Sequence, residues 1–454
     1  MGKNLVIIGG GAGGASIAAE VRRRDPAMSV TMIEAGNFVS TAACPMPYYI
    51  GDLIKDENNL IARTPEKFRE TGVDVRINTR VDGIDAAKGS VALSDGTALP
   101  YDVLALATST DAFVPPIPGV DQEGVFTLKR LPDAIAIKHY IEKEQCRKAV
   151  IVGGGFIGME MCEALRMRGI DTRVIDLAPR PVMRWDPEFT RAIVEEMERH
   201  DVPFLPDTKT IAIEKGREFR FRLNTNRGEM NADLIIMAVG IRPVNNLAKD
   251  LGLETGKTGA VRVNFAQRTS KENIYAVGDC CEVYHLVSRK WVHIPLGDIA
   301  NKQGRVAGIN IGGDSMIFPG IVGAQSFRIF NLEVAATGID EREALESGYS
   351  PACTIVWEDS IVGAMPDAKR VGIKLVADRS TAKLLGAQTV GETGAVSRIN
   401  TLSCALTAGM GLQDIGYLDF AYAPPFSPAW DPIHVAAQQL LRQMQSNAVG
   451  ACNL

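Results

Sequence analysis

Residues 3–35 read KNLVIIGGGAGGASIAAEVRRRDPAMSVTMIEA and indicate how the first domain is built. The stretch begins with the apolar run at residues 5–8, as expected of a parallel strand that is covered on both faces. The run breaks at a G-x-G-x-x-G motif, small residues then open a helix, and a second apolar run ends in Glu34. This order of strand, glycine turn, helix, strand and acid predicts a dinucleotide-binding βαβ unit.

Each of the three motif positions requires glycine for a physical reason. Gly9 makes the tight turn, Gly11 lets the backbone approach a pyrophosphate, and Gly14 lets the helix pack closely on the strand. The N-terminus of the following helix offers free N–H groups and a positive potential to the phosphates. We expect Glu34 to accept hydrogen bonds from the hydroxyl groups of an adenosine ribose.

The same unit returns at residues 147–178, RKAVIVGGGFIGMEMCEALRMRGIDTRVIDLA. Gly153, Gly155 and Gly158 occupy the three motif positions after a second apolar strand, and Asp176 ends the strand that follows. Two such turns in one chain predict two bound dinucleotides.

Asp176 also bears on which nicotinamide dinucleotide binds to the second turn. A carboxylate at this position suits a free 2′-hydroxyl and repels a 2′-phosphate, which favours NADH. Arg180 and Arg184 follow shortly in the sequence and leave NADPH open as the alternative.

Length and composition limit the other possibilities. A chain of 454 residues is too long for one ordinary core and predicts about three domains. The formal net charge is -5 and there is no basic block, which argues against nucleic acid as a partner. No run approaches the ~18 apolar residues of a membrane span, and residues 1–10 lead directly into a strand instead of a signal peptide. We therefore expect a cytoplasmic protein with no membrane partner.

The eight cysteines form no C-x-x-C pair, and no histidine stands at zinc-ligand spacing from them. This pattern predicts neither a disulfide scaffold nor a metal site. Most of the cysteines are expected to be small buried side chains. This includes Cys280 and Cys281, for which a strained vicinal disulfide is the alternative. Cys452 is expected on a solvated tail, and the alternative is that it serves as a second reactive thiol in another copy of the chain.

Cys44 is the exception among the cysteines. It lies in VSTAACPMPYYIGD, residues 39–52, shortly after Glu34, so the fold returns it toward the first dinucleotide. Pro45 follows directly, and proline favours the first turn of a helix. We expect the free N–H groups of that helix to lower the pKa of the Cys44 thiol and to make it a thiolate nucleophile. A loop cysteine that merely packs is the alternative.

Three later segments resemble the pyridine nucleotide–disulfide oxidoreductase superfamily. ALATSTDAFVPPIPG, residues 105–119, is a strand with a proline-rich crossover, and AVGIRP, residues 238–243, is the return crossing. IYAVGDCCEV, residues 274–283, is a strand followed by Gly278 and Asp279. The resemblance covers essentially the whole chain. It implies an α/β protein with two Rossmann-like domains of the three-layer ββα type and an α+β C-terminal dimerisation domain.

The resemblance also implies domain boundaries and cofactors. The FAD-binding domain would comprise residues 1–112 and 243–320, the NAD(P)H-binding domain residues 113–242, and the dimerisation domain residues 321–454. FAD would occupy the first glycine turn and NADH or NADPH the second. The dimerisation domain implies that the protein acts as a homodimer.

Further cofactor contacts are implied by the same resemblance. Asp279, with Gly278, would hold the FAD ribitol, and Glu160 would orient the nicotinamide end. The segment ANKQGR, residues 300–305, would start a helix whose N-terminus faces the flavin pyrimidine ring, where reduction builds negative charge. Contacts at the two crossings would come from Ala107, Thr108 and Gly240.

The sequence around Cys44 resembles the branch of the superfamily that has a single redox cysteine. The usual C-x-x-x-x-C pair is absent because Tyr49 stands at the second position. The oxidised form of one cysteine must then be a sulfenic acid, or a mixed disulfide or persulfide with a small molecule. This branch contains coenzyme A disulfide reductases, coenzyme A persulfide or polysulfide reductases, NADH oxidases and NADH peroxidases.

Other segments favour the coenzyme A enzymes within this branch. The oxidases and peroxidases usually carry a histidine inside the first glycine turn, where this chain has Ala12. The segments GGAS, RRRDP and YAPPFSPAWDP instead resemble the coenzyme A enzymes. The resemblance implies substrate contacts from Arg23 and Ser40, and a proton-donating Tyr422 from the partner subunit. An interface aromatic is the alternative for Tyr422.

The chain departs from the coenzyme A branch at Glu20, Ala43 and Trp430, where the branch usually has Gln, Asn and often Lys. An added acid and a lost lysine are expected to weaken the binding of a polyphosphate substrate. The chemistry at Cys44 is therefore predicted more firmly than the thiol that it acts on, and coenzyme A is one candidate.

The sequence thus predicts an FAD-dependent NAD(P)H:disulfide or persulfide oxidoreductase. A hydride would pass from NAD(P)H through FAD to Cys44, which would reduce a low-molecular-weight disulfide, persulfide or polysulfide such as a coenzyme A derivative. Three alternatives stay open. They are an NADH oxidase or peroxidase with a Cys44 sulfenic acid, a flavin electron-transfer reductase with an inert Cys44, and a non-catalytic redox sensor.

Overall fold

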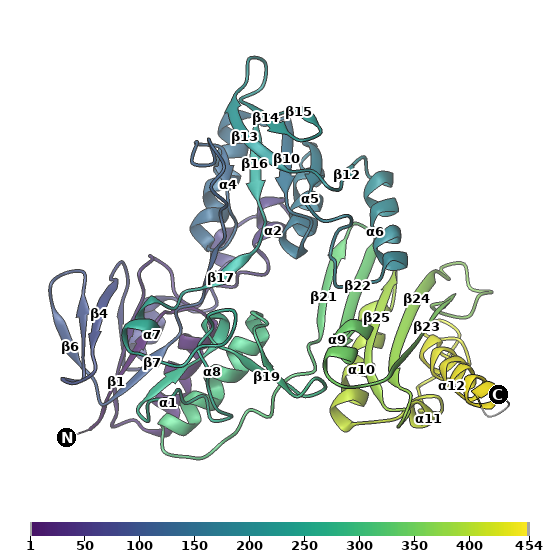
Figure 1. The fold of residues 1–454 in the computed structure, drawn as a ribbon. Coiled ribbons are helices and arrows are strands. Elements are labelled where there is room, and N and C mark those ends of the chain that lie inside the picture. Colours follow the sequence, from purple (N-terminus) through teal and green to yellow (C-terminus); the bar gives the residue numbers. More distant parts are fainter. Residues whose placement is uncertain (1, 452–454) are drawn as a thin grey trace.

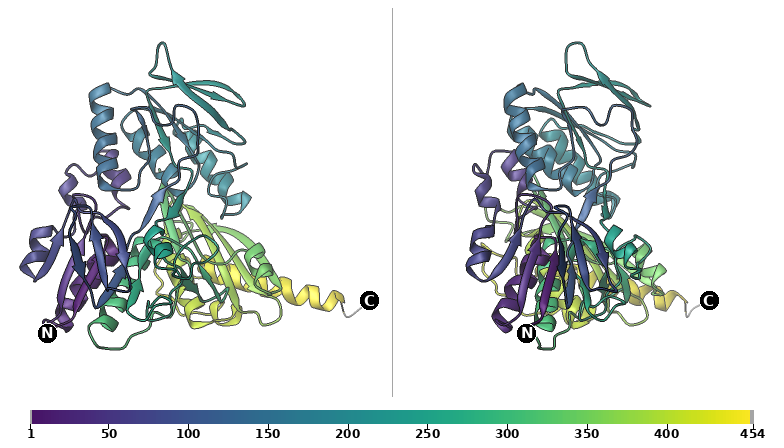
Figure 2. Two further views of the ribbon diagram at one scale, coloured as in Figure 1. Left: turned by 60° about the vertical axis from the view of Figure 1, so that its left-hand side comes forward. Right: turned by 90° about the vertical axis from the view of Figure 1, so that its left-hand side faces the viewer.

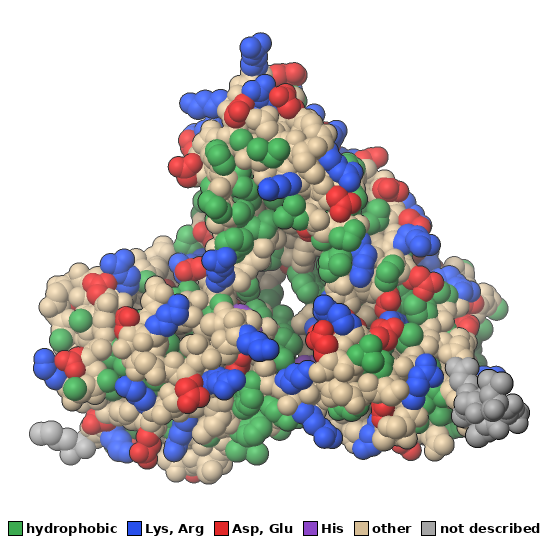
Figure 3. Space-filling view, in the orientation of Figure 1, with side chains coloured by type: hydrophobic (Ala, Val, Ile, Leu, Met, Phe, Trp, Pro, Cys, Tyr) green, Lys and Arg blue, Asp and Glu red, His purple; other side chains and the backbone are tan. Residues whose placement is uncertain are grey.

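The computed structural model describes residues 2–451, which form three lobes (Figure 1). Two lobes are built on parallel sheets and the third on an antiparallel sheet. In the space-filling view the three lobes surround a central opening (Figure 3). No helix among residues 2–451 is both long and apolar enough to cross a bilayer.

The first lobe contains a parallel sheet of five strands in the order β18-β7-β1-β2-β3. Its outermost strand β18 comes from far along the chain, so this lobe is assembled from two separate stretches of sequence. The strands are β1 (Asn4–Ile8), β2 (Ser29–Ile33), β3 (Val73–Arg76), β7 (Val103–Leu106) and β18 (Ile274–Ala276).

Alternate side chains of β1 pack in two hydrophobic cores, one on each face of the sheet. Leu5 and Ile7 pack with the helices α1 (Ala12–Arg24) and α8 (Gly297–Ile311) on one face of the sheet. Val6 and Ile8 pack on the other face, where an antiparallel layer lies. That layer consists of β4 (Val81–Asp85), β5 (Ser90–Leu93) and β6 (Ala98–Pro100). Burial on both faces explains the uninterrupted apolar run.

The second lobe repeats this three-layer plan. Its parallel sheet has the order β12-β11-β10-β16-β9, with helices on one face and an antiparallel meander on the other. The strands are β9 (Val125–Phe126), β10 (Lys148–Val152), β11 (Asp171–Ile175), β12 (Phe204–Leu205) and β16 (Leu234–Met237). The helices are α4 (Leu131–Glu144) and α5 (Phe156–Met167), and the meander is β13 (Thr210–Lys215), β14 (Phe221–Thr225) and β15 (Gly228–Ala232).

The two crossings between these lobes lie side by side. β8 (Thr110–Ala112) pairs with β17 (Ile241–Pro243) in an antiparallel ladder. The exact residues at which one domain passes into the next stay a prediction from the sequence.

The third lobe carries a five-stranded antiparallel sheet in the order β21-β22-β25-β24-β23. Two long helices, α10 (Ala395–Ala408) and α12 (Pro432–Ala451), cover it, and Figure 2 shows α12 extending outward from the lobe. The strands are β21 (Gln325–Ile329), β22 (Leu332–Gly338), β23 (Pro351–Asp359), β24 (Arg370–Asp378) and β25 (Leu384–Gly391). The predicted combination of two ββα lobes and an α+β lobe is confirmed.

The remaining elements complete the fold. They are α2 (Met46–Ile50), α3 (Pro65–Glu70), α6 (Pro187–Arg199), α7 (Asn246–Asp250), α9 (Glu341–Glu346), α11 (Leu412–Ile415), β19 (Val283–His285), β20 (Lys290–Val292) and single 3-10 turns at Glu57–Leu60 and Gly278–Cys280.

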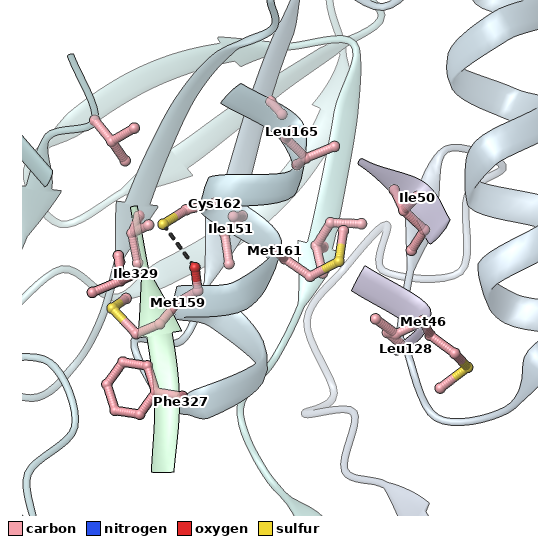
Figure 4. Close-up of a cluster of buried hydrophobic side chains, with 14 of the residues drawn as sticks. Met46, Ile50, Leu128, Ile151, Met159, Met161, Cys162, Leu165, Phe327 and Ile329 are labelled. Atoms are coloured by element: carbon pink, nitrogen blue, oxygen red, sulfur yellow. Dashed lines mark hydrogen bonds between the residues drawn. The ribbon is translucent and has the colours of Figure 1, made fainter. Parts of the chain in front are cut away.

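Helix α2 lies between strands of the first lobe in sequence but packs in the core of the second. Met46, Tyr49 and Ile50 belong to the same buried cluster as the apolar faces of α4 and α5. Figure 4 shows Met46 and Ile50 near Leu128 and the α5 side chains. No motif in the amino-acid sequence predicted that α2 packs in the second lobe.

Candidate active site

The first glycine turn has the geometry that a pyrophosphate requires. Gly9 has a φ of +105°, and a Cβ on Gly14 would overlap the carbonyl oxygen of Gly9. Around Gly11, which precedes α1, no atom lies within 4 Å of the place where a Cβ would stand. Backbone therefore fills the space beside the first and third glycines, while the second faces open space at a helix N-terminus.

The second turn repeats this arrangement. Gly153 has a φ of +111°, a Cβ on Gly158 would overlap the carbonyl oxygen of Gly153, and Gly155 again faces open space before α5. Both turns therefore fit a dinucleotide pyrophosphate, as the sequence predicted from the glycine spacing.

The acid at the end of each second strand is anchored beside its glycine turn. The N–H groups of Gly10 and Gly36 donate to the carboxylate of Glu34, each at 2.8 Å. The N–H groups of Gly154 and Ala178 donate to Asp176, at 2.5 and 2.8 Å. Each carboxylate is thus fixed by backbone donors at the edge of the turn, where the ribose of a bound dinucleotide is predicted.

The residues expected at the crossings lie where the first two lobes meet. The N–H of Ala107 donates to the carbonyl of Ile8 at 2.8 Å, and the Thr108 hydroxyl donates to the carbonyl of Val244 at 2.7 Å. Gly240 has a φ of +120°, and its carbonyl accepts from the N–H of Phe113 at 2.8 Å. Their predicted contacts with cofactors stay predictions.

Asp279 lies in the turn that follows β18, after Gly278 with its φ of +76°. Its carboxylate is 3.0 Å from the ammonium group of Lys129 and accepts weakly from the hydroxyls of Ser109 and Thr110, at 3.4 and 3.5 Å. Asp279 therefore lies where the first lobe, the crossing and the start of α4 converge.

Lys129 is a site residue that sequence reasoning missed. Its backbone N–H and that of Arg130 both donate to the carboxylate of Asp133, at 2.9 and 2.8 Å, which fixes the chain at the start of α4. The signal in the sequence is only an N-terminal capping acid, and it does not reveal that Lys129 meets Asp279.

Cys44 lies before α2, with Pro45 as the N-cap residue of that helix. It is exposed, and its Sγ is 3.9 Å from the place where a Cβ on Gly297 would stand. Gly297 is the first residue of α8, which therefore begins three residues earlier than the predicted start at residue 300. The fold thus brings the Cys44 sulfur to the N-terminus of a helix of 15 residues.

The expected lowering of the Cys44 pKa is wrong for the polypeptide. Desolvation by the surrounding protein raises the pKa of the thiol, and the negative charges of Glu160, Asp279 and Asp298 raise it further. The physical reason is that burial takes water away from the thiol and three carboxylates act on it, whereas α2 spans only 5 residues and contributes little positive potential.

Glu160 is the carboxylate with the largest effect on the Cys44 thiol. Burial, with a contribution from Glu163, raises the pKa of Glu160 to about 7. Both glutamates line a narrow cavity of about 10 Å³ together with Tyr48, which follows Cys44 by one turn. A carboxyl group that titrates near neutral pH therefore lies beside the cysteine segment.

The proposed substrate contacts begin beside the first glycine turn. The N–H of Ser40, a residue with a φ of +51°, donates to the carbonyl of Gly10 at 2.7 Å. Arg23 is 68% exposed at its side chain and forms an ion pair with the buried Glu20, which also binds Arg24 at 3.0 Å. The acid that departs from the family pattern thus pairs with both Arg23 and Arg24.

Tyr422 lies in the third lobe, in the loop before α12, and is 56% exposed. Tyr417, Phe426 and Trp430 are exposed aromatic residues of the same segment. A role for Tyr422 in a partner's site stays a prediction.

The remaining cysteines separate into two groups. Cys280 and Cys281 are buried free thiols, as expected from the sequence, and the alternative of a vicinal disulfide is wrong. Cys146 and Cys162 are buried as well. Cys353 and Cys404 are exposed, so the expectation that Cys44 is the single exception is wrong, and exposure alone does not distinguish it. Cys452 lies outside the described residues.

Comparison with known proteins agrees with this geometry. The family model for pyridine nucleotide-disulphide oxidoreductases matches residues 3–304, and the model for their dimerisation domain matches residues 324–432. The NAD(P)H coenzyme A polysulfide/persulfide reductase of Pyrococcus horikoshii is 38% identical, over 97% of this chain and 99% of that protein.

Two further relatives match nearly the whole of this chain. An NADH oxidase of Methanocaldococcus jannaschii is 32% identical, over 97% of this chain and 99% of that protein. The solved structure of an NAD-dependent persulfide reductase from A. fulgidus superimposes with a TM-score of 0.94 at 36% identity, covering 98% of this chain and 84% of that one. The chain therefore belongs to the pyridine nucleotide–disulfide oxidoreductase family.

Proposed function

We propose that this protein is an FAD-dependent NAD(P)H:disulfide or persulfide oxidoreductase with Cys44 as its redox residue. The observation that carries the proposal is the exposed free thiol of Cys44 at the N-terminus of α8, in a chain with two dinucleotide turns. The relatives named as persulfide reductases support the same chemistry.

The proposed cofactor sites follow from the fit of the two turns. The turn at Gly11 and the carboxylate of Glu34 would hold the adenosine diphosphate part of FAD, and Asp279 would bind its ribitol. The turn at Gly155 and Asp176 would hold NAD(P)H, with NADH favoured by the acid. Bound FAD supplies the two-electron step, which takes a hydride from the nicotinamide and delivers an electron pair to sulfur.

Cys44 would perform the substrate chemistry. Its thiolate attacks one sulfur of R–S–S–R, an S–S bond to Cys44 forms, and the other sulfur leaves as a thiolate that takes up a proton. Two electrons then cleave the new S–S bond, which regenerates the Cys44 thiolate and releases the second sulfur as a thiol. A persulfide R–S–SH reacts in the same way, with hydrosulfide as one product.

The substrate would be a low-molecular-weight disulfide, persulfide or polysulfide, such as a coenzyme A derivative. The names of the relatives and the position of Ser40 beside the first turn support this class. The pairing of Arg23 with Glu20 reduces the positive charge offered to phosphates.

The active unit would be a homodimer. The dimerisation-domain match and the exposed aromatic residues around Tyr422 support this proposal. Tyr422 of the partner subunit would protonate the leaving thiolate.

A Cys44→Ser variant tests this function. With NADH and coenzyme A disulfide under anaerobic conditions, we expect turnover to fall to background, because the nucleophile is lost. Reduction of the bound flavin by NADH should persist, because that step does not use Cys44. Cys353→Ser is the matched control, since it removes another exposed thiol, and it should leave turnover unchanged.

Mass spectrometry of the non-reduced protein adds an independent test. We expect a low-molecular-weight thiol or extra sulfur on Cys44, and its mass would identify the substrate class. Full disulfide turnover by Cys44→Ser would contradict the proposal and favour a flavin electron-transfer reductase.

An NADH oxidase is the second candidate, because a relative at 32% identity carries that name. In that case Cys44 would cycle through a sulfenic acid. Rapid NADH consumption in air, with none in anaerobic buffer containing a disulfide, would favour the oxidase. The alanine at position 12, where the oxidases usually have a histidine, argues against it.

A further inference from the structure

A buried cation fastens the cysteine segment to the second lobe. The side chain of Lys138, on α4, is only 11% exposed, and its ammonium group is 2.9 Å from a carboxylate oxygen of Asp52. The same ammonium group lies 4.2 Å above the centre of the Tyr49 ring. The ion pair and the cation–π contact hold Tyr49 of α2, and Asp52 just beyond that helix, against α4.

Helix α5 holds the same segment from its other side. Arg168, at the end of α5, donates to the carbonyl of Ile50 at 3.2 Å and lies 4.0 Å from Asp52. A Cβ on Gly51 would stand 3.0 Å from the Cα of Ala164, so the chain after α2 rests directly on α5. The segment has little freedom to shift relative to the NAD(P)H-binding lobe.

Asp52 adopts a conformation that needs support. Its φ of +69° lies in the left-handed region, which costs energy for residues other than glycine unless neighbours stabilise it. The hydrogen bond from Lys138 lowers the pKa of Asp52, which keeps its carboxylate charged and paired. The ion pair therefore stabilises the turn that ends α2.

We propose that Lys138 and Asp52 are positioning residues for Cys44. Their ion pair anchors α2 in the NAD(P)H-binding lobe, so this lobe, together with the hydrogen bond of Ser40 to the first lobe, sets the position of the sulfur at the N-terminus of α8. The inference rests on the proposed redox role of Cys44.

Such anchoring matters because sulfur exchange depends on a close and directed approach. The start of α2 lies two residues after Cys44, and the ion pair acts at the other end of this single short helix. Loss of the pair would let the helix shift as a unit and move the thiol away from Gly297. A displacement of about 1 Å can lower a reaction rate by ~10²-fold.

The test compares Lys138→Met and Asp52→Asn in the holoenzyme. Lys138→Met keeps the apolar stem, and the carboxylate that it leaves is 40% exposed and can be hydrated. We expect turnover with coenzyme A disulfide to fall by at least ~10-fold in both variants. Reduction of the flavin by NADH should stay within about twofold of wild type, because the glycine turn of α5 is unaltered. The rate at which iodoacetamide alkylates Cys44 should change as well.

Lys148→Met is the matched control, because it breaks an ion pair with Asp171 in the same lobe without touching α2. It should leave both half-reactions and the alkylation rate unchanged. Wild-type alkylation and disulfide turnover in both test variants would overturn the proposal. So would an equal loss in both half-reactions, which would indicate a merely structural role. Full turnover by Cys44→Ser would instead refute the proposed function itself.

Discussion

At the level of single residues, the site brings together Glu160 and Cys44, and each is harder to ionise when the other carries its negative charge. Among the charged groups, Glu160 has the largest effect in raising the pKa of the Cys44 thiol. Burial raises the pKa of Glu160 itself to about 7. A proton on Glu160 therefore favours the thiolate at Cys44, and loss of that proton disfavours it. The reductase cycle consumes a proton at each turnover, and a carboxyl group that titrates near neutral pH is suited to this site.

Glu160→Gln should make Cys44 more reactive at neutral pH. The amide carries no negative charge, so the pKa of the Cys44 thiol should fall relative to wild type. The pH profile of Cys44 alkylation by iodoacetamide, followed by mass spectrometry, should shift toward lower pH. An unchanged or opposite shift would show that Glu160 does not act on the sulfur.

The same variant should change how stability depends on pH. Glu160 has a pKa of about 7 in the folded protein against 4.5 as a free side chain, so the folded state binds this proton more tightly. Its contribution to stability is fully present below pH 4.5 and is lost as the pH rises through about 7. At pH 8 the variant should gain up to ~3 kcal/mol relative to wild type, a gain that disappears near pH 4.5. Denaturant unfolding at both pH values measures the difference.

At the level of elements, the two glycine turns were predictable because each motif position is required by the local geometry of the turn. Strand, turn, helix and acid follow one another within about thirty residues, so a linear sequence contains nearly all of the relevant information. Glu34 and Asp176 both lie beside their turns as expected.

Contacts between residues far apart in the chain could not be predicted from such local motifs. The burial of α2 in the second lobe and the pairing of Lys129 with Asp279 join residues that are far apart in sequence. The short apolar stretch around Tyr49 fits a core in either lobe. The raised pKa of Cys44 has the same origin, because both the burial of the thiol and the three carboxylates that act on it depend on distant segments.

A pair of alanine substitutions in the second glycine turn separates folding from cofactor binding. Gly158→Ala should destabilise the second lobe by ~1–3 kcal/mol or more, because its Cβ would overlap the carbonyl oxygen of Gly153. Gly155→Ala meets no protein atom and should leave stability unchanged, while its methyl group enters the space predicted for the pyrophosphate. Its KM for NADH should rise. Thermal unfolding and steady-state kinetics check both, and equal behaviour of the two variants would contradict this assignment.

At the level of the whole molecule, the three lobes place each part of the proposed reaction on a different element. The first lobe contributes Asp279 and the N-terminus of α8, and the second contributes Glu160 and the anchor of α2. The third lobe presents exposed aromatic residues around Tyr422. In a two-fold dimer one surface meets its own copy, so a residue of this lobe can complete the site of the partner.

Mixed dimers test whether Tyr422 acts across the interface. One subunit carries Cys44→Ser and the other Tyr422→Phe, and differently tagged copies are co-expressed so that the heterodimer can be purified. If Tyr422 serves the partner, the subunit that keeps Cys44 receives an intact tyrosine from the Cys44→Ser subunit. One of two sites is then complete, and the heterodimer should show about half of the wild-type turnover with coenzyme A disulfide. If Tyr422 acted within its own subunit, neither site would be complete and the heterodimer would be no more active than the Tyr422→Phe homodimer. Retention of full activity by that homodimer would mean that Tyr422 only packs in the interface.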